Sequence, residues 1–307
     1  MTKNKNRKII VFLSVIRRRY TWLFFLAPVI IILISIVIFP LIFSLSLSFH
    51  EWNVIRGKEW TWIGLENYKT IFLYDPYFRS TLKVTFLYLL GTVPLQFALG
   101  LAVALILNRI TTKIIGFLRT TLIVPTTMTP VVVGIIWRLM YNPDLGMLNY
   151  FLTLFGFPPI NWVGKPETAL PSVMMADIWE WTPFMALILL AGLQALPQDS
   201  FEAAIVDGAS SWQIFRYITL PLLTPIMMVA LLIRIMDSFK TFDLIFVLTQ
   251  GGPGMSTEVL NYYTYRYGFK FFHMGYASAL SWLVLVIVTV ISISLIRVLQ
   301  TKNIAKG

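Results

Sequence analysis

The sequence predicts an all-α polytopic membrane protein in which six transmembrane helices are joined by short connections and one patterned polar loop. The first observation is composition: 57% of the 307 residues are hydrophobic and only 13% are charged, whereas soluble domains are about half apolar and a quarter charged. The second is the presence of six segments whose length is close to the roughly 20 mainly apolar residues that a helix needs to cross a bilayer. The third is a helix–glycine–helix pattern at residues 197–221, too polar to enter lipid.

The six expected spans divide the chain into three parts. Residues 1–21 form a basic N-terminus, residues 22–299 form the six-helix membrane domain, and residues 300–307 form a tail. The first span follows basic residues as a signal peptide would, but its apolar run exceeds the roughly 7–15 residues of a cleavable core. We therefore expect a retained anchor. The approximate spans are Trp22–Leu47, Leu82–Leu107, Leu118–Met140, Ala169–Leu193, Leu222–Leu248 and Ala277–Leu299.

Prolines lie inside the second and third expected spans, at Pro94, Pro125 and Pro130. An intramembrane proline leaves a backbone carbonyl unpaired, and neighbouring helices or water must satisfy it. Each proline is either a kink that serves packing or a bend that lets a gate rock, and the sequence does not separate the two. Between the first two spans we expect a short helix lying along the membrane near Leu65–Phe72.

Lysine and arginine set the expected orientation, because short cytoplasmic loops carry an excess of them. Basic residues without acids precede the first span, follow the second and occupy the tail, and these three places fall on one side in a six-span count. Both termini are therefore expected in the cytoplasm. These residues are Lys3, Lys5, Arg7, Lys8, Arg17, Arg18, Arg19, Arg109, Lys113, Arg119, Lys302 and Lys306.

Charge and residue usage exclude several functions. The net charge of +11 is concentrated beside membrane ends, where anionic lipid accounts for it, so we expect no nucleic-acid partner. The absence of cysteine rules out a disulfide, a thiolate nucleophile and a zinc-thiolate site. The two histidines, His50 and His273, show no metal-ligand spacing. We therefore expect no metal site and no catalytic residues in this chain.

The polar stretch between spans four and five has the pattern of two short helices joined at a glycine. Pro197 ends the preceding span, Asp199 is the expected N-cap of a new helix, and Glu202 is placed to complete a capping box. Gly208 supplies the helix stop, and Ser210 or Ser211 can cap the second helix. We call residues 197–221 the elbow. By shape alone it is either an interfacial connection or a docking element.

The residues from Glu202 to Pro221 favour docking. Glu-Ala-Ala, three residues, glycine, nine residues and Ile-x-Leu-Pro stand there intact, which resembles the signature loop of the membrane-spanning subunits of binding-protein-dependent ABC importers. Asp207-Gly208-Ala209 and Phe215 resemble the maltose-permease-like sugar permeases. The resemblance implies a type I importer transmembrane domain whose loop is a coupling helix seated in a separate ATPase subunit. The implied ATPase-coupling residues are Glu202, Ala203, Ala204, Asp207, Gly208, Ala209, Trp212 and Phe215.

Two carboxylates, Asp177 and Glu180, lie in the outer half of span four. Charges are costly in lipid, so these side chains should face protein or a wet cavity. Asp177 and Trp181 are four residues apart and share a helix face, and a carboxylate beside an indole suits a sugar, which has both hydroxyls and apolar ring faces. The alternative is an interfacial tryptophan belt with acids near the headgroups. The candidate substrate-path residues here are Asp177, Glu180, Trp181 and Phe184.

Span five carries Arg234, Asp237, Lys240 and Asp243, at every third position and with alternating charge. Neighbouring members can pair along one side of the helix, either as a self-neutralising ladder packed on another subunit or as a hydrophilic lining of a translocation path. In maltose-like permeases the sugar site lies between the helices that flank the signature loop, and this resemblance favours the lining. The candidate path residues of this span are Arg234, Asp237, Ser238 and Thr241.

The glycine-rich stretch after span five, residues 249–257, lacks the Gly-Lys-Ser/Thr ending of a phosphate-binding loop. It resembles the Thr-x-Gly-Gly-Pro outer loop of the same family. We therefore interpret Gly251, Gly252 and Pro253 as a tight turn in an outer gate.

The resemblance implies the transmembrane subunit of an ATP-driven carbohydrate importer in a bacterial or archaeal cell membrane. The implied partners are a second permease subunit in a heterodimer, two ATPase subunits, an extracellular solute-binding protein and the carbohydrate itself, with ATP and magnesium bound by the ATPase rather than by this chain. The alternative is an ion-coupled secondary transporter that uses Arg234, Asp237 and Asp243 as a relay. A membrane enzyme is disfavoured, because no catalytic set is grouped in the sequence.

Overall fold

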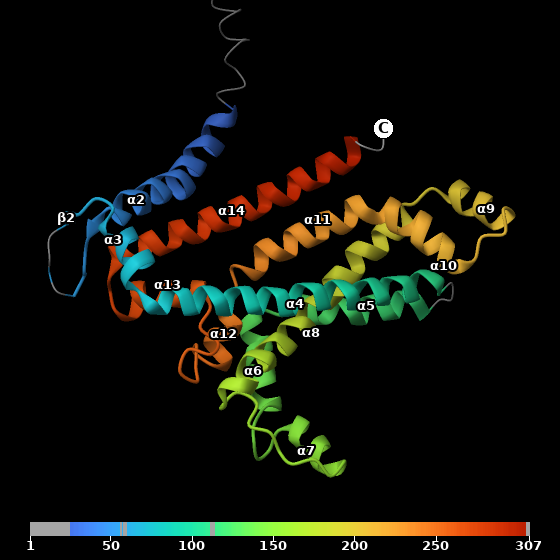
Figure 1. The fold of residues 1–307 in the computed structure, drawn as a ribbon, viewed down its shortest axis with the longest axis horizontal. Coiled ribbons are helices and arrows are strands. Elements are labelled where there is room, and N and C mark those ends of the chain that lie inside the picture. The colour runs from blue at the N-terminus through green and yellow to red at the C-terminus, as the bar shows by residue number, and fades with distance from the viewer. Residues whose placement is uncertain (1–24, 56, 58–59, 111–113, 305–307) are drawn as a thin grey trace, which may run out of the picture.

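The computed structural model describes residues 25–55, 57, 60–110 and 114–304, so the predicted basic N-terminus lies outside the described residues. Long helices dominate this part of the chain (Figure 1). Five are long and apolar enough to cross a membrane, and a sixth crossing is formed if a helix pair bent by 94° counts as one span. These segments are Phe25–Ser48, Pro76–Arg109, the pair Ile115–Thr127 and Pro130–Met140, Pro166–Gln194, Ser211–Ser238 and Met274–Arg297.

The first span contains a π-helical turn, η1 (Ile34–Ile38), followed by α2 (Phe39–Ser48). Beyond it, β1 (His50–Glu51) pairs antiparallel with β2 (Thr61–Trp62). The predicted short helix near Leu65–Phe72 is present as α3 (Glu66–Lys69) and η2 (Thr70–Tyr74). The last helix, α14 (Met274–Ile304), packs beside α2 (Figure 1).

The helix α4 (Pro76–Arg109) begins after an N-cap residue, Asp75. The Asp75 carboxylate accepts hydrogen bonds from the backbone nitrogens of Tyr77 (2.9 Å) and Phe78 (3.2 Å), and so pairs two donors that a helix start leaves free. Pro94 lies inside α4 without ending it. The helix runs along α8 (Pro166–Gln194), and Gly100 permits the contact, since a Cβ there would lie 2.7 Å from that of Met185.

The third span is not one straight helix. It consists of α5 (Ile114–Thr127) and α6 (Pro130–Met140), which meet at an angle of 94°. Pro125 lies inside α5, whereas Pro130 is the first residue of α6. Proline is compatible with the first turn of a helix but not with its interior ladder of hydrogen bonds, so the bend falls immediately before Pro130. The helix α7 (Met147–Leu154) then precedes α8.

The fifth span differs from the expected Leu222–Leu248. The helices α10 (Ser211–Ile214), η3 (Phe215–Thr219) and α11 (Leu220–Ser238) form one continuous segment, and the chain turns before α12 (Asp243–Leu248). Aromatic contacts account for the break: Phe239 is buried against the edge of Phe86, and Phe242 stacks on Phe246. Within the turn, short backbone hydrogen bonds from Lys240 N to Asp237 O (2.8 Å) and from Thr241 N to Ser238 O (3.3 Å) take the place of the helical ones.

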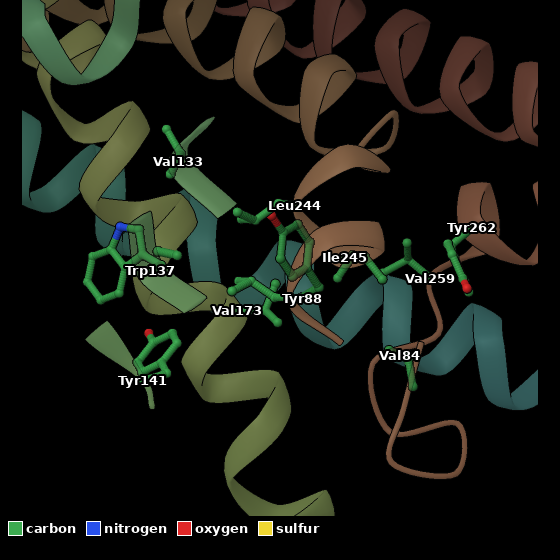
Figure 2. Close-up of a cluster of buried hydrophobic side chains, with 12 residues drawn as sticks. Val84, Tyr88, Val133, Trp137, Tyr141, Val173, Leu244, Ile245, Val259 and Tyr262 are labelled. Carbon is green, nitrogen blue, oxygen red and sulfur yellow. The ribbon is translucent and has the colours of Figure 1, made fainter. Parts of the chain in front are cut away.

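A buried cluster around Tyr88 of α4 fixes the turn after α11. Figure 2 shows side chains from α6, α8 and α12 gathered with this tyrosine. After α12 the chain passes through the glycine-rich loop into α13 (Leu260–Tyr265) and η4 (Arg266–Lys270), and then into α14. The cluster therefore holds the segments on either side of the turn against the long α4–α8 pair.

Candidate functional site

The elbow contains α9 (Gln198–Val206), a left-handed glycine and α10, and it projects from one end of the bundle (Figure 1). Gly208 has φ +76°, a conformation that favours glycine. Ser210 and Gln213 form a reciprocal capping box, with Gln213 N donating to Ser210 Oγ (3.4 Å) and Ser210 N donating to Gln213 Oε1 (2.7 Å). The predicted glycine stop and serine cap are confirmed.

The predicted cap at Asp199 is wrong. The N-cap of α9 is Pro197, and Asp199 lies in the first turn of the helix. Proline has no N–H for a reciprocal partner to accept, so Glu202 does not complete a capping box there. Among the described residues, Glu202 forms no hydrogen bond or ion pair, and its side chain is exposed. This carboxylate is therefore available to a partner.

The exposed face of the elbow is markedly apolar. Trp212 is 68% exposed and Val206 is 87% exposed, while Ile205 and Tyr217 beside them are exposed as well. Trp212 packs on the half-buried Phe215 at 5.5 Å between ring centroids. The sequence pattern singled out neither Ile205 nor Val206, although both follow Glu-Ala-Ala directly. Of the remaining residues expected there, Ala203, Asp207 and Gly208 are exposed, and Ala204 and Ala209 are half-buried.

A buried polar network joins the helices on either side of the elbow. Arg234 of α11 is only 1% exposed, and its Nη2 donates to Asp177 Oδ2 of α8 at 2.5 Å. Its Nη1 donates to Asp237 Oδ2 at 2.8 Å, and its Nε donates to Gln96 Oε1 of α4 at 2.7 Å. The guanidinium also lies 4.8 Å from the centre of the Trp181 ring. Three helices therefore meet at one cation.

Gln96 completes this network and was not among the predicted site residues. Its Nε2 donates both to the Asp177 carboxylate (2.8 Å) and to the Asp177 backbone oxygen (3.0 Å). It lies on α4, two residues after Pro94. The signal in the sequence was a polar amide side chain within an apolar span, where polar groups need hydrogen-bond partners. Only the packing of α4 on α8 reveals which partner it has.

A small cavity of about 110 Å³ lies directly beside the network, and we call it the inner pocket. Glu180 of α8 is buried at its wall and forms no hydrogen bond or ion pair with any described residue. Because an unpaired buried carboxylate is costly, the pocket suits a ligand that can donate hydrogen bonds. The lining residues are Pro130, Asp177, Glu180, Trp181, Asp237, Lys240, Thr241, Phe242, Asp243 and Leu244.

Other predicted path residues lie near the inner pocket without lining it. Arg234 stands behind Asp177 and Asp237, Ser238 is buried with its hydroxyl unpaired within the described part of the chain, and Phe184 packs against Trp181 at 5.6 Å. The predicted ladder along one helix is wrong beyond Asp237. Helix α11 ends at Ser238, so Lys240 lies in the turn and Asp243 begins α12. Both nevertheless return to the pocket wall.

The glycine-rich loop is a tight turn, as predicted. Gly252 N donates to the Thr249 backbone oxygen at 3.0 Å, and the Thr257 hydroxyl donates to the Gly252 oxygen at 2.9 Å. Gly251 is buried with φ +82°, and a Cβ there would lie 2.9 Å from Tyr262 Cε1. The bond between Gly252 and Pro253 is cis. A side chain at Gly251 is therefore excluded both by conformation and by space.

An ion pair anchors the end of this loop. Arg266 Nη1 donates to both carboxylate oxygens of Glu258, at 2.6 and 2.5 Å. Burial raises the pKa of Glu258 above its usual value, and Arg266 opposes this rise without cancelling it. The loop that includes Gly251, Gly252 and Pro253 is therefore tied to η4, and through it to the start of α14.

Residues 96–304 match the family described as "Binding-protein-dependent transport system inner membrane component". A probable ABC transporter permease protein of Sinorhizobium fredii is 41% identical over 277 residues, covering 90% of this chain and 89% of that protein. The trehalose/maltose transport system permease protein MalF of Thermococcus litoralis is 38% identical over 271 residues, covering 88% of this chain and 90% of that protein. A chain from the crystal structure of a bacterial ABC transporter involved in alginate import has a TM-score of 0.82 at 25% identity, covering 93% of this chain and 97% of its own.

Proposed function

The chain belongs to the family of binding-protein-dependent transport system inner membrane components, and we propose that it is one permease subunit of an ATP-driven carbohydrate importer. Two relatives support the substrate class: one is a trehalose/maltose permease and the other belongs to an alginate importer. The single observation that carries the proposal is the exposed elbow. Its first helix presents Glu202, which is unpaired among the described residues, beside an apolar surface, and its second helix continues into the polar network.

The elbow is the part of this chain that transmits force. Glu202 pairs with a basic residue of an ATPase subunit, while Trp212, Ile205 and Val206 bury apolar surface in the same contact. Since α10, η3 and α11 form one continuous helical segment from Ser211 to Ser238, a displacement of the elbow moves the end of α11 that carries Arg234 and Asp237. ATP and magnesium are held by the ATPase, and this chain is not itself an enzyme.

The inner pocket is this subunit's part of the translocation path. Sugar hydroxyls donate to the carboxylates of Glu180 and Asp237, and the ring face packs on Trp181. Arg234 fixes Asp177 and Asp237 and thereby positions the acceptors without occupying the pocket itself. A second permease completes the path as a heterodimer, two ATPases bind at the elbow end, and a solute-binding protein delivers sugar at the opposite end.

The proposed orientation places the elbow and both termini in the cytoplasm of a bacterial or archaeal cell. It is supported by the basic residues near the elbow end of the bundle, such as Arg109 at the end of α4. The loop of Gly251, Gly252 and Pro253 then belongs to an outer gate.

An ion-coupled secondary transporter remains the alternative candidate, because Glu180 is a buried carboxylate without a partner among the described residues. Such a relay would need mobile charges. Arg234 instead donates hydrogen bonds from its Nε, Nη1 and Nη2 groups to three different residues. This arrangement favours a fixed structural role for its charge. The two functions differ in their requirement for the ATPase.

The test is a charge reversal, Glu202→Lys, in the full complex reconstituted with its ATPases, second permease and solute-binding protein. We expect sugar-stimulated ATP hydrolysis to be lost while expression of this subunit is unchanged. The matched control is Asp144→Lys, an exposed acid in the turn between α6 and α7, far from the elbow. Stimulation that survives Glu202→Lys, or uphill transport by this protein without any ATPase, would contradict the proposal.

A further inference from the structure

A second and larger cavity lies between α13, η4 and the first turns of α14. Its volume is about 410 Å³, against about 110 Å³ for the inner pocket. We call it the aromatic groove and define it by Phe242, Asn261, Tyr265, Phe269 and Ser278, which all line it. Ligand sites in proteins commonly enclose roughly 300–1,000 Å³, and the volume of the aromatic groove falls within this range.

Three aromatic rings form one wall of the groove: Phe242 is tilted by 59° against Tyr265, and Tyr265 stacks on Phe269. The centroids of Phe242 and Tyr265 are 4.8 Å apart, and those of Tyr265 and Phe269 are 5.4 Å apart with only 25° between their planes. Phe269 ends the row and is 64% exposed. The exposed Phe269 ring at the end of this row presents flat apolar surface of the kind on which the C–H face of a sugar ring packs.

Two polar groups in the same groove lack partners. The Asn261 side chain is held by its Nδ2, which donates to the Lys240 backbone oxygen at 2.9 Å, and its Oδ1 receives no hydrogen bond from the described residues. The half-buried Ser278 hydroxyl likewise makes no hydrogen bond within the part of the chain that the structure describes. A lipid tail or an apolar helix lodged there would leave both groups unsatisfied at a cost. The groove therefore suits an occupant that is apolar on one face and carries hydroxyls.

The aromatic groove and the inner pocket are neighbouring cavities that share one wall residue. Phe242 lines both cavities. Lys240 lines the inner pocket, while its backbone oxygen holds Asn261 of the groove. The two cavities therefore meet at Phe242, with Tyr265 and Phe269 on the groove side of this ring.

We propose that the aromatic groove is a second sugar subsite, so that this permease carries an oligosaccharide of at least two rings rather than a monosaccharide. One ring lies in the inner pocket and another stacks on Tyr265 and Phe269, with its hydroxyls bonded to Asn261 Oδ1 and Ser278 Oγ. This inference rests on the proposed function, since it needs a carbohydrate substrate.

The experiment measures saccharide binding to the solubilised complex of both permeases and both ATPases. The solute-binding protein is left out, so that only binding to the membrane subunits is measured. The probes are glucose, trehalose, maltose, maltotriose and the di- and trisaccharides of alginate, with calorimetry as the readout. The variants are Phe269→Leu, which keeps an apolar side chain but removes the ring, and Ser278→Ala. The control is Phe72→Leu, an exposed ring of η2 that does not line the groove.

We expect each variant to raise the dissociation constant of a bound di- or trisaccharide roughly fivefold, with no change for Phe72→Leu. Unchanged dissociation constants in both variants would overturn the subsite, as would a wild-type complex that binds only glucose, although carbohydrate import would then still stand. Loss of the second permease from purified Phe269→Leu complex would instead identify the groove as a subunit interface and also overturn it. A wild-type complex that neither binds nor transports any of these saccharides would refute the proposed function itself.

Discussion

The substitution Arg234→Met tests how the polar network holds α4, α8 and α11 together. Methionine fills most of the same volume but removes the cation, so three acceptors lose the arginine at once: Asp177 Oδ2 at 2.5 Å, Asp237 Oδ2 at 2.8 Å and Gln96 Oε1 at 2.7 Å. Asp177 Oδ2 keeps only the neutral Gln96 amide as a donor. The cation–π contact with Trp181 is lost as well. Asp237 can be hydrated through the inner pocket, whereas Asp177 remains buried.

The magnitude follows from burial. The Arg234 and Asp177 side chains are 1% and 3% exposed, and removing one partner of a buried pair costs about 3–5 kcal/mol because the remaining charge is unpaired. The pair between Lys69 and Glu66 offers the contrast, since these side chains are 60% and 53% exposed. An exposed pair contributes about 0–1 kcal/mol, so Lys69→Met should be nearly neutral.

The assay is reversible unfolding of the purified subunit in mixed micelles, followed by circular dichroism as denaturing detergent increases. We expect Arg234→Met to lower the free energy of unfolding by about 3–5 kcal/mol. The double variant Arg234→Met/Asp177→Asn should recover part of that loss, because it removes the stranded charge. A loss no larger than that of Lys69→Met, or a double variant as unstable as the sum of the single ones, would refute the reasoning.

Three further predictions follow from local geometry. Gly275→Ala should impair folding, because a Cβ there would lie 2.0 Å from the His50 backbone oxygen, and the yield of folded protein measures this. Gly208→Ala should lower sugar-stimulated ATP hydrolysis severalfold, since its φ of +76° costs an L-residue about 1 kcal/mol; equal stimulation would show that the elbow tolerates another turn. The raised pKa of buried Glu258 means that the folded state binds this proton more tightly, so its contribution to stability is complete below the ordinary glutamate pKa of about 4.3 and is lost as pH rises through the folded pKa. Melting temperatures measured against pH should show this decline, and Glu258→Gln should flatten it even though Arg266 remains.

Hydrophobicity along the chain was sufficient to locate the apolar segments, because lipid demands about 20 apolar residues whatever the tertiary contacts are; five are spans, and a sixth is formed if the bent pair counts as one. It did not locate the breaks. The turn after Ser238 depends on how aromatic side chains pack on neighbouring helices, and the bend falls at Pro130 rather than at Pro94 or Pro125, which hydrophobicity does not distinguish. For this reason one expected span proved to be bent and another ended early.

The elbow could be predicted nearly in full, because its chemistry is local: a left-handed glycine and a serine cap act within a few residues of themselves. The error at Asp199 arose because an acidic residue is a preferred N-cap, whereas the helix begins two residues earlier with Pro197 at that position. The contacts of the candidate path residues, by contrast, could not be predicted from local sequence. Asp177, Glu180 and Asp237 were identified as costly charges in lipid, but no spacing could show that Gln96, far away along the chain, binds both Asp177 and Arg234.

The sequence by itself determined that this chain is a polytopic membrane protein with a helix–glycine–helix elbow, since composition, hydrophobic length and short-range capping are properties of contiguous residues. Only the tertiary structure decided which charges pair, which carboxylate stays unpaired and how the inner pocket meets the aromatic groove. The physical reason is that a buried charge is stabilised by whichever partner packing brings within about 3 Å, and packing joins helices that the sequence keeps apart.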